Sequence, residues 1–245
     1  MVRFKELERL GVALAVMTDI TDGDCGMRGS DSETCRESLA ADSAGNRMRV
    51  CAACGIRPED LVCGMQVHGT QIAVAGEADR GRGFRKGLLA FPGTDGLITL
   101  VKNLPLALFV ADCVPVFIAD PISGSVGLVH AGREGTLHGI AALAIQRMMQ
   151  IPGTQPRTFH ALIGPSAGPC CYEVDPLRAK EFAAAGLPVR GRYLDLWQAN
   201  AIQLAGTGVP ASNIMVSGVC TICSGRYHSH RRTADGSRNM ALISA

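Results

Sequence analysis

LPLALFVADCVPVFIADPISGSVGLVHAGREGT, residues 104–136, contains three short apolar runs. The runs lie at 106–111, 114–119 and 125–129, and PISG at 121–124 forms a turn before the third. Short, partly β-branched runs bounded by turn residues are typical of strands. Because the apolar residues are continuous and do not alternate with polar ones, we expect these strands to be buried on both faces.

Two polar positions interrupt this apolar background. Asp112-Cys113 and His130 each stand where a strand is expected to end and a bend marked by Gly or Pro to begin. Strand ends and the loops after them are where binding and catalytic groups concentrate. A thiol beside an imidazole allows two chemistries, a soft-metal site or a nucleophile with its base.

A third candidate ligand lies upstream. QVHG at 66–69 again places a His before a Gly, ahead of an alternating segment at 70–75. His68, Cys113 and His130 would supply three ligands to zinc and leave a fourth position for water or substrate, which is the arrangement of a catalytic zinc site. The spacing forms no local motif, so Cys113 with a metal-free His base stays open as an interpretation.

Composition limits the classes of protein to consider. The chain has 245 residues, 47% of them hydrophobic and 19% charged, and its net charge is +2. This apolar content is enough for a large core, while so small a net charge gives no field for nucleic acid or an anionic membrane. No apolar run reaches the length of a membrane span, and the start, MVRFKELERLGVALAVM, lacks an export h-region. We therefore expect a cytoplasmic protein with neither nucleic acid nor membrane as partner.

The ten cysteines are expected to be reduced. In a chain with a core of this size they do not indicate a disulfide-stapled domain. Two pairs have C-x-x-C spacing, Cys51 with Cys54 and Cys220 with Cys223. A zinc ribbon formed by the two pairs is disfavoured, because the first pair falls in a predicted helix and ribbon knuckles are close in sequence, which these are not.

The rest of the chain mixes strand and helix patterns. Further strand-like runs lie at 12–17, 97–101, 159–163 and 214–219. Apolar residues over 137–148 recur at helical spacing, and 195–204 forms a second amphipathic helical pattern that ends at Gly206. Together these patterns predict an α/β (α+β mixed) fold, with one compact domain over residues 1–245 in which helices flank mixed β-sheets.

Several motifs follow one another in unbroken order from about Asn46 to the C-terminus. They are QVHG (66–69), TDGLIT (94–99), ADCVPVFIADP (111–121), HAG (130–132), IGPSAGPCCYEV (163–174), LDLWQAN (194–200) and SHRRTADGSRNMALI (229–243). Together they resemble the YfiH/laccase-domain family, also called the multicopper polyphenol oxidase or purine nucleoside phosphorylase family. Residues 1–42 match this family weakly.

The resemblance implies a YfiH-like fold that holds zinc through His68, Cys113 and His130, which would also be the catalytic groups. It implies cleavage of purine nucleosides with phosphate, and adenosine deamination as a second activity. Guanidinium groups pair with phosphate in a bidentate way, so arginines lead the substrate-binding candidates. The candidates are one carboxylate and five arginines: Asp95, Arg47, Arg133, Arg231, Arg232 and Arg238.

The chain departs from the family in the loop after His130. Members usually read HAGWRG, whereas this chain reads HAGREG at 130–135, so that Arg133 replaces an aromatic residue and Glu134 replaces a cation. The usual FFSYRR likewise becomes YHSHRR at 227–232. The metal ligands are kept while the rim has changed, so the identity of the substrate is open.

Three other functions stay open. A copper-dependent, laccase-like polyphenol oxidase is less favoured, because it needs several coppers with mainly His ligands and the chain has six His in all. A metal-free cysteine hydrolase would use Cys113 as nucleophile and His130 or His68 as base. A catalytically impaired zinc-binding member would keep the metal and lose turnover. Zinc is the expected metal, with copper as the alternative.

Overall fold

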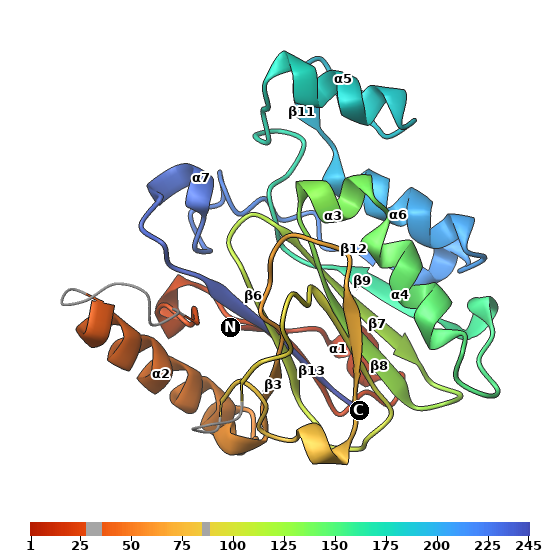
Figure 1. Ribbon diagram of the computed structural model, residues 1–245. Coiled ribbons are helices and arrows are strands. Elements are labelled where there is room, and N and C mark those ends of the chain that lie inside the picture. Colours follow the sequence, from red (N-terminus) through yellow and green to blue (C-terminus); the bar gives the residue numbers. More distant parts are fainter. Residues whose placement is uncertain (28–35, 85–88) are drawn as a thin grey trace.

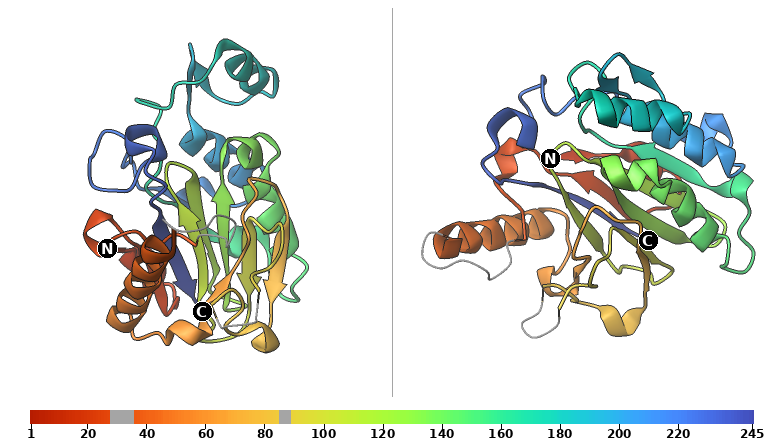
Figure 2. Two further views of the ribbon diagram at one scale, coloured as in Figure 1. Left: turned by 60° about the vertical axis from the view of Figure 1, so that its left-hand side comes forward. Right: turned by 45° about the horizontal axis from the view of Figure 1, so that its top comes forward.

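The computed structural model describes residues 1–27, 36–84 and 89–245, with side chains described from Asp42 onward after the first gap. Two β-sheets pack face to face, and helices cover their outer faces (Figure 1). Figure 2 shows the same layers from two further sides, with α2 and α4 on opposite sides of the sheets. This arrangement confirms the predicted single domain of mixed sheets flanked by helices.

The first sheet has five strands in the order β1-β2-β13-β6-β3. Their bounds are Val2–Arg3 (β1), Leu14–Met17 (β2), Asn239–Ser244 (β13), Leu106–Val110 (β6) and Val62–Cys63 (β3). β13 pairs antiparallel with both β2 and β6, so the C-terminal strand is central. β6 and β13 are buried throughout, because one face packs on the second sheet and the other on helix α2, Arg36–Ala53.

The second sheet has six strands in the order β12-β9-β7-β8-β5-β4. Their bounds are Ile214–Val216 (β12), His160–Ile163 (β9), Val114–Asp120 (β7), Ser125–Ala131 (β8), Gly96–Thr99 (β5) and Ile72–Ala75 (β4). β7 and β8 form an antiparallel pair in which Val116 lies opposite Val129. Every residue of both strands is buried, as their continuous apolar sequence predicts.

The three strands predicted from residues 104–136 are confirmed, but they belong to two different sheets. β6 lies in the first sheet and β7 and β8 in the second, so the chain passes from one sheet to the other at Asp112 and Cys113. Asp112 has a φ of 85°, a left-handed conformation that few non-glycine residues adopt. The passage places the Cys113 thiol at the end of both sheets and outside either strand.

Helices α4, Ile140–Met148, and α6, Leu196–Gly206, cover the outer face of the second sheet. The single helical pattern over 137–148 is in fact two helices, α3 (Arg133–Leu137) and α4. Gly139 separates them, because its φ of 74° lies in the left-handed region and breaks the helical path.

The remaining elements are short. They are α1 (Lys5–Glu8), α5 (Pro176–Ala184), α7 (His230–Thr233), β10 (Val189–Arg190), β11 (Tyr193–Leu194) and the 3₁₀ helices Ile20–Asp22, Pro58–Asp60, Glu77–Asp79, Pro156–Thr158 and Ala211–Asn213. The β10–β11 hairpin and α5 project beyond the end of the second sheet (Figure 1). This is the end at which β8 leads into α3, so these elements border the site described next.

Candidate metal centre and adjoining pocket

The structure brings His68, Cys113 and His130 together. One donor atom from each lies within 4.8 Å of the others, and the two imidazole rings meet edge to face with centroids 4.9 Å apart. The three residues come from the loop between β3 and β4, from the bend between β6 and β7, and from β8. His130 is buried whereas His68 is exposed, so this three-donor set is open to solvent on one side.

Asp95 fixes the orientation of both histidines. Its carboxylate, which is fully buried, lies 2.7 Å from Nδ1 of His130 and accepts hydrogen bonds from the backbone amides of Val67, His68 and Gly69 at 2.8–3.1 Å. Burial favours protonation, but the bonds from His130 and the amides outweigh it and lower the pKa of Asp95. The three amides hold His68 in a left-handed conformation with φ 63°.

Asp112 anchors the bend that carries Cys113. Its carboxylate accepts hydrogen bonds from the Thr221 hydroxyl and from the backbone amide of Arg231, both at 2.7 Å. Its carbonyl accepts a bond from the amide of Ala167 at 2.9 Å. One buried residue therefore links the thiol-bearing bend to the loops after β9 and β12 and to α7.

The thiol and the buried imidazole form a charge pair. Burial opposes ionisation of Cys113, yet His130 and His68 together lower the pKa of its thiol to about 6. Burial likewise opposes protonation of His130, yet the Cys113 thiolate and Asp95 raise its pKa to about 9. A thiolate is the form that binds a metal, and it is also the nucleophilic form. The donor chemistry fits a soft or borderline metal ion.

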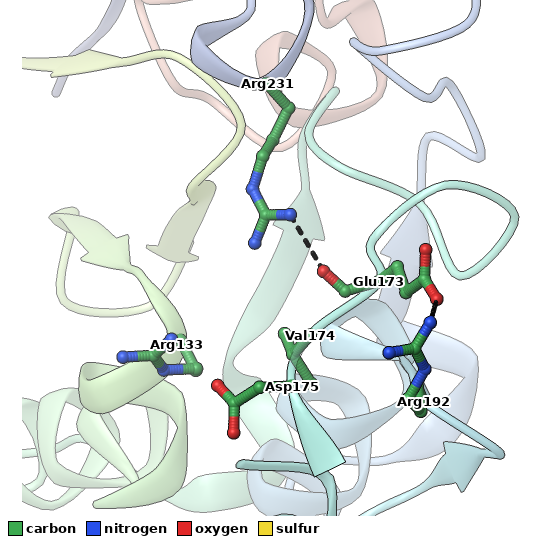
Figure 3. A pocket seen from close by; sticks show the side chains of 6 residues that line it. All are labelled: Arg133, Glu173, Val174, Asp175, Arg192 and Arg231. Carbon is green, nitrogen blue, oxygen red and sulfur yellow. Dashed lines mark hydrogen bonds and ion pairs between the residues drawn. The ribbon is translucent and has the colours of Figure 1, made fainter. Parts of the chain in front are cut away.

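A polar pocket of about 380 Å³ lies at the same end of the sheets (Figure 3). Its lining is almost wholly charged: Arg133, Glu173, Val174, Asp175, Arg192 and Arg231. Arg133 begins α3 directly after Gly132, and a Cβ added at Gly132 would come within 3.1 Å of the Cys113 sulfur and of the His68 ring. The backbone that leads into the pocket at Arg133 therefore packs against two of the candidate metal ligands, His68 and Cys113.

The pocket arginines have different partners. Arg133 pairs with Glu134 at 2.8 Å, and Arg192 pairs with the Glu173 carboxylate. Arg231 donates to the Glu173 carbonyl at 2.8 Å, and its guanidinium lies 4.9 Å from the centre of the Tyr172 ring. Figure 3 shows Arg231 reaching in from α7 and Arg133 lying across the pocket from Arg192.

The other candidate arginines do not line this pocket. Arg47 donates to the carbonyls of Cys25 and Gly26. Arg232 donates to the carbonyls of Thr221, Ile222 and Tyr227. Arg238 donates to the Ser237 carbonyl. In these contacts the guanidinium groups hold loops in place. The sequence alone does not distinguish an arginine with this structural role from one that binds phosphate.

Arg192 and Asp175 are among the pocket residues that sequence reasoning did not select. Arg192 lies in the turn of the β10–β11 hairpin, and nothing in its local pattern separates it from a surface arginine. Asp175 carries a signal of another kind, since it precedes Pro176 and caps α5 by accepting bonds from the amides of Leu177 and Arg178. That signal predicts a helix start and says nothing of a pocket.

Comparison with known proteins places this geometry in a family. The family model described as multi-copper polyphenol oxidoreductase laccase matches residues 34–245. The chain belongs to this family. The laccase-domain resemblance found in the motifs is therefore confirmed, and the match leaves out residues 1–33.

Several relatives of this laccase-domain chain carry names that state an activity. The chain is 41% identical over 202 residues to a protein named purine nucleoside phosphorylase YlmD from Geobacillus stearothermophilus, covering 78% of this chain and 74% of the relative. It is 36% identical over 206 residues to a purine nucleoside phosphorylase from Deinococcus radiodurans, covering 82% and 76%.

Solved structures agree with the fold. A Bacillus licheniformis hypothetical protein YfiH superimposes with a TM-score of 0.82 at 32% identity, covering 94% of this chain and 92% of the other. YlmD from Geobacillus stearothermophilus gives a TM-score of 0.80 at 34% identity, covering 94% and 91%. The YfiH-like fold is therefore shown. Among the helices of residues 1–27, 36–84 and 89–245, none has the length and apolar character of a membrane span.

Proposed function

We propose that this protein is a zinc-dependent purine nucleoside phosphorylase. The observation that carries the proposal is the convergence of His68, Cys113 and His130 beside an arginine-lined pocket. The names of the relatives point to the same reaction. The substrates would be a purine nucleoside and inorganic phosphate.

Zinc is the metal that the donor set fits best. Two imidazoles and one thiolate are zinc ligands of the kind found in catalytic sites, and a thiolate disfavours magnesium and calcium. His68, Cys113 and His130 would hold the ion, which supplies a Lewis-acidic position that polarises an oxygen of a bound ligand. Copper remains the alternative, as the family description suggests.

Phosphorolysis requires a phosphate held close to the ribose. A phosphate oxygen forms a bond to C1′ while the bond from C1′ to the purine nitrogen breaks, and the base leaves with the electron pair. Arg133 and Arg231 are the arginines that line the pocket and adjoin the metal ligands, so we assign the phosphate to them. Glu134 partly neutralises Arg133, which would weaken phosphate binding relative to family members with a cation at this position.

Asp95 would act by positioning. It is fully buried, and its hydrogen bond to Nδ1 of His130 leaves Nε2, beside the Cys113 thiol, as the nitrogen that would bind the metal. The carboxylates next to the ligands, Asp95 and Asp112, are both occupied by hydrogen bonds, so neither is offered as a proton carrier for deamination. Adenosine deamination is therefore not part of the proposed mechanism, and it is measured separately as a second activity.

The test uses purified protein with inosine or adenosine, with and without phosphate. We expect phosphate-dependent formation of the free base and ribose 1-phosphate, followed by chromatography, and its loss in His68→Ala, Cys113→Ala and His130→Ala alike. His138→Ala, at the end of α3 and outside the donor set, is the matched control. Ammonia release from adenosine reports deamination. Metal-loaded protein that forms no free base would contradict the proposal and favour an impaired zinc-binding member.

A metal-free cysteine hydrolase is the second candidate, because Cys113 and His130 form a thiolate and imidazolium pair. Chelation separates the two functions. A metal-dependent phosphorylase loses its phosphorolytic activity when the ion is removed and regains it with zinc. A cysteine hydrolase keeps its hydrolytic activity after chelation and loses it when the Cys113 thiol is alkylated. Inhibition by alkylation alone, without metal dependence, would decide for the hydrolase.

A further inference from the structure

Four cysteines outside the candidate metal centre meet at one place. The sulfur atoms of Cys170, Cys171, Cys220 and Cys223 all lie within 4.8 Å of one another. From the sequence, the only arrangement considered for Cys220 and Cys223 was a zinc ribbon with Cys51 and Cys54, which the helical position of the latter pair disfavours. Cys51 and Cys54 indeed lie in and just after α2, and Cys170 and Cys171 take the place of that pair.

The fold brings the two cysteine pairs together through parallel strands. β9 and β12 pair in parallel, with Ile214 opposite Ala161 and Val216 opposite Ile163. The pairing continues past the strand ends, because the amide of Ser166 donates to the Val219 carbonyl and the amide of Thr221 to the Ser166 carbonyl. Parallel strands end at the same edge, so the loops that follow both carry their cysteines to one side.

The sulfur spacing fits a tetrahedral metal site. Four thiolates about 2.3 Å from a zinc ion stand about 3.8 Å apart along the edges of the tetrahedron. The sulfur atoms of Cys170 and Cys223 are 3.8 Å apart. A disulfide would instead need about 2.05 Å between two sulfurs.

The backbone around Cys220 supports a thiolate. The amide of Gly168 donates to the Cys220 sulfur at 3.3 Å, and the amides of Ile222 and Cys223 also donate to it. A C-x-x-C turn that wraps its own amides around the first sulfur stabilises negative charge on that sulfur. Cys220 is buried while Cys170 and Cys223 are exposed, so an ion can enter from solvent and reach a preformed inner ligand.

We infer that Cys170, Cys171, Cys220 and Cys223 form a second metal site, which binds a zinc ion through four thiolates. With four protein ligands the site has no open position for water or substrate, so its role is structural. It is separate from the His68, Cys113 and His130 centre, with which it shares no ligand.

The loops that the second site joins support the first. Thr221, between Cys220 and Cys223, donates to the carboxylate of Asp112, which anchors the bend of Cys113. Tyr172 follows Cys171 directly and lies under the Arg231 guanidinium. Metal bound to the four cysteines would therefore hold the loops after β9 and β12 in the positions on which the pocket depends.

The test is the metal content of protein purified under reducing conditions and exposed to zinc, followed by exhaustive dialysis. We expect about two zinc ions per chain in wild type and about one in Cys170→Ser with Cys223→Ser, because a closed tetrathiolate site cannot survive the loss of two ligands. Both residues are exposed, so serine there leaves the core intact. Cys51→Ala with Cys54→Ala, the other C-x-x-C pair, should keep both ions.

A second variant, Cys113→Ala, tests the four-cysteine site separately from the His68, Cys113 and His130 centre. Cys113→Ala should keep the ion of the four-cysteine site and lose the other, and cobalt added in place of zinc should then show the absorption of a tetrathiolate complex. Unchanged zinc content in Cys170→Ser with Cys223→Ser would overturn the inference. So would the finding that these four thiols, counted in denatured protein without reductant, are oxidised to disulfides.

Discussion

The Nδ1 atom of His130 lies 2.7 Å from the Oδ1 atom of Asp95, and both groups are buried. Because the pKa of Asp95 is lowered, its carboxylate is ionised and can only accept, so Nδ1 carries a proton and Nε2 is the ring nitrogen that interacts with the Cys113 thiol. The same carboxylate holds the backbone of Val67 to Gly69, so one side chain orients two of the three candidate metal ligands.

Asp95→Asn should weaken metal binding about 10- to 100-fold, the usual effect of losing the partner that orients a metal-bound histidine. Both carboxylate oxygens of Asp95 accept hydrogen bonds, whereas an asparagine amide offers one acceptor oxygen and an NH₂ group that cannot accept from the backbone amides or from Nδ1 of His130. Zinc affinity measured by competition with a chromophoric chelator tests this. Asp120→Asn is the matched control, because Asp120 is also buried and caps a turn away from the donor set. Equal affinity in both variants would remove Asp95 from the site.

Cys113→Ala should lower the bound metal by about one ion per chain, because a catalytic zinc site has three protein ligands and the thiolate is the softest of them. Elemental analysis of purified protein measures this directly. The thiol of Cys54 is half-buried just after α2, and Cys54→Ala should leave the bound metal per chain unchanged. A full complement of zinc in Cys113→Ala, or several coppers per chain in wild type, would exclude the proposed centre.

The metal-free Cys113 thiol should react with iodoacetamide at unusually low pH. Its pKa is lowered to about 6, so the thiolate fraction rises through pH 6 and is nearly complete at pH 7. Burial raises the pKa of Cys63 to about 12, so that thiol should stay unreacted over this range. Peptide-level mass spectrometry of chelator-treated protein resolves the two sites. A midpoint near the ordinary cysteine value would show that His130 and His68 do not stabilise the thiolate.

Arg133→Trp with Glu134→Arg should raise kcat/KM for phosphorolysis of an ordinary purine nucleoside about tenfold, equivalent to about 1.4 kcal/mol of transition-state stabilisation. The change removes the Arg133 and Glu134 ion pair, adds an aromatic face for the base and replaces a negative charge beside the phosphate. Zinc content should stay the same. Arg147→Trp, on the exposed face of α4, controls for an added indole. Identical kcat/KM for every nucleoside would mean that this loop takes no part in recognition.

Arg231→Lys should raise the KM for phosphate about tenfold and leave the metal in place, because lysine keeps the charge but lacks the planar fork that binds phosphate. Steady-state kinetics at varied phosphate measures the effect. Arg178→Lys, in a surface ion pair on α5, should behave as wild type. A change confined to kcat would place Arg231 in a role other than phosphate binding.

Residues 104–136 determined more than any other part of the chain. Their continuous apolar runs predicted β6, β7 and β8 and their complete burial, because such runs report the local environment of each strand. The placement of Cys113 and His130 at strand ends, with His68 ahead of a further strand, predicted the three-donor set that the structure brings together.

Other features depended on which segments meet. Strand runs do not state their sheet, so the passage from β6 to β7 at Asp112 appeared only in three dimensions. The sequence does not show whether an arginine lines a pocket, as Arg231 does, or donates its hydrogen bonds to backbone carbonyls, as Arg232 does. Cys220 likewise has local C-x-x-C spacing with Cys223, but Cys170 and Cys171 lie beside it only because β9 and β12 pair in parallel. Local patterns fix burial and conformation, whereas the partners of polar groups are set by tertiary contacts.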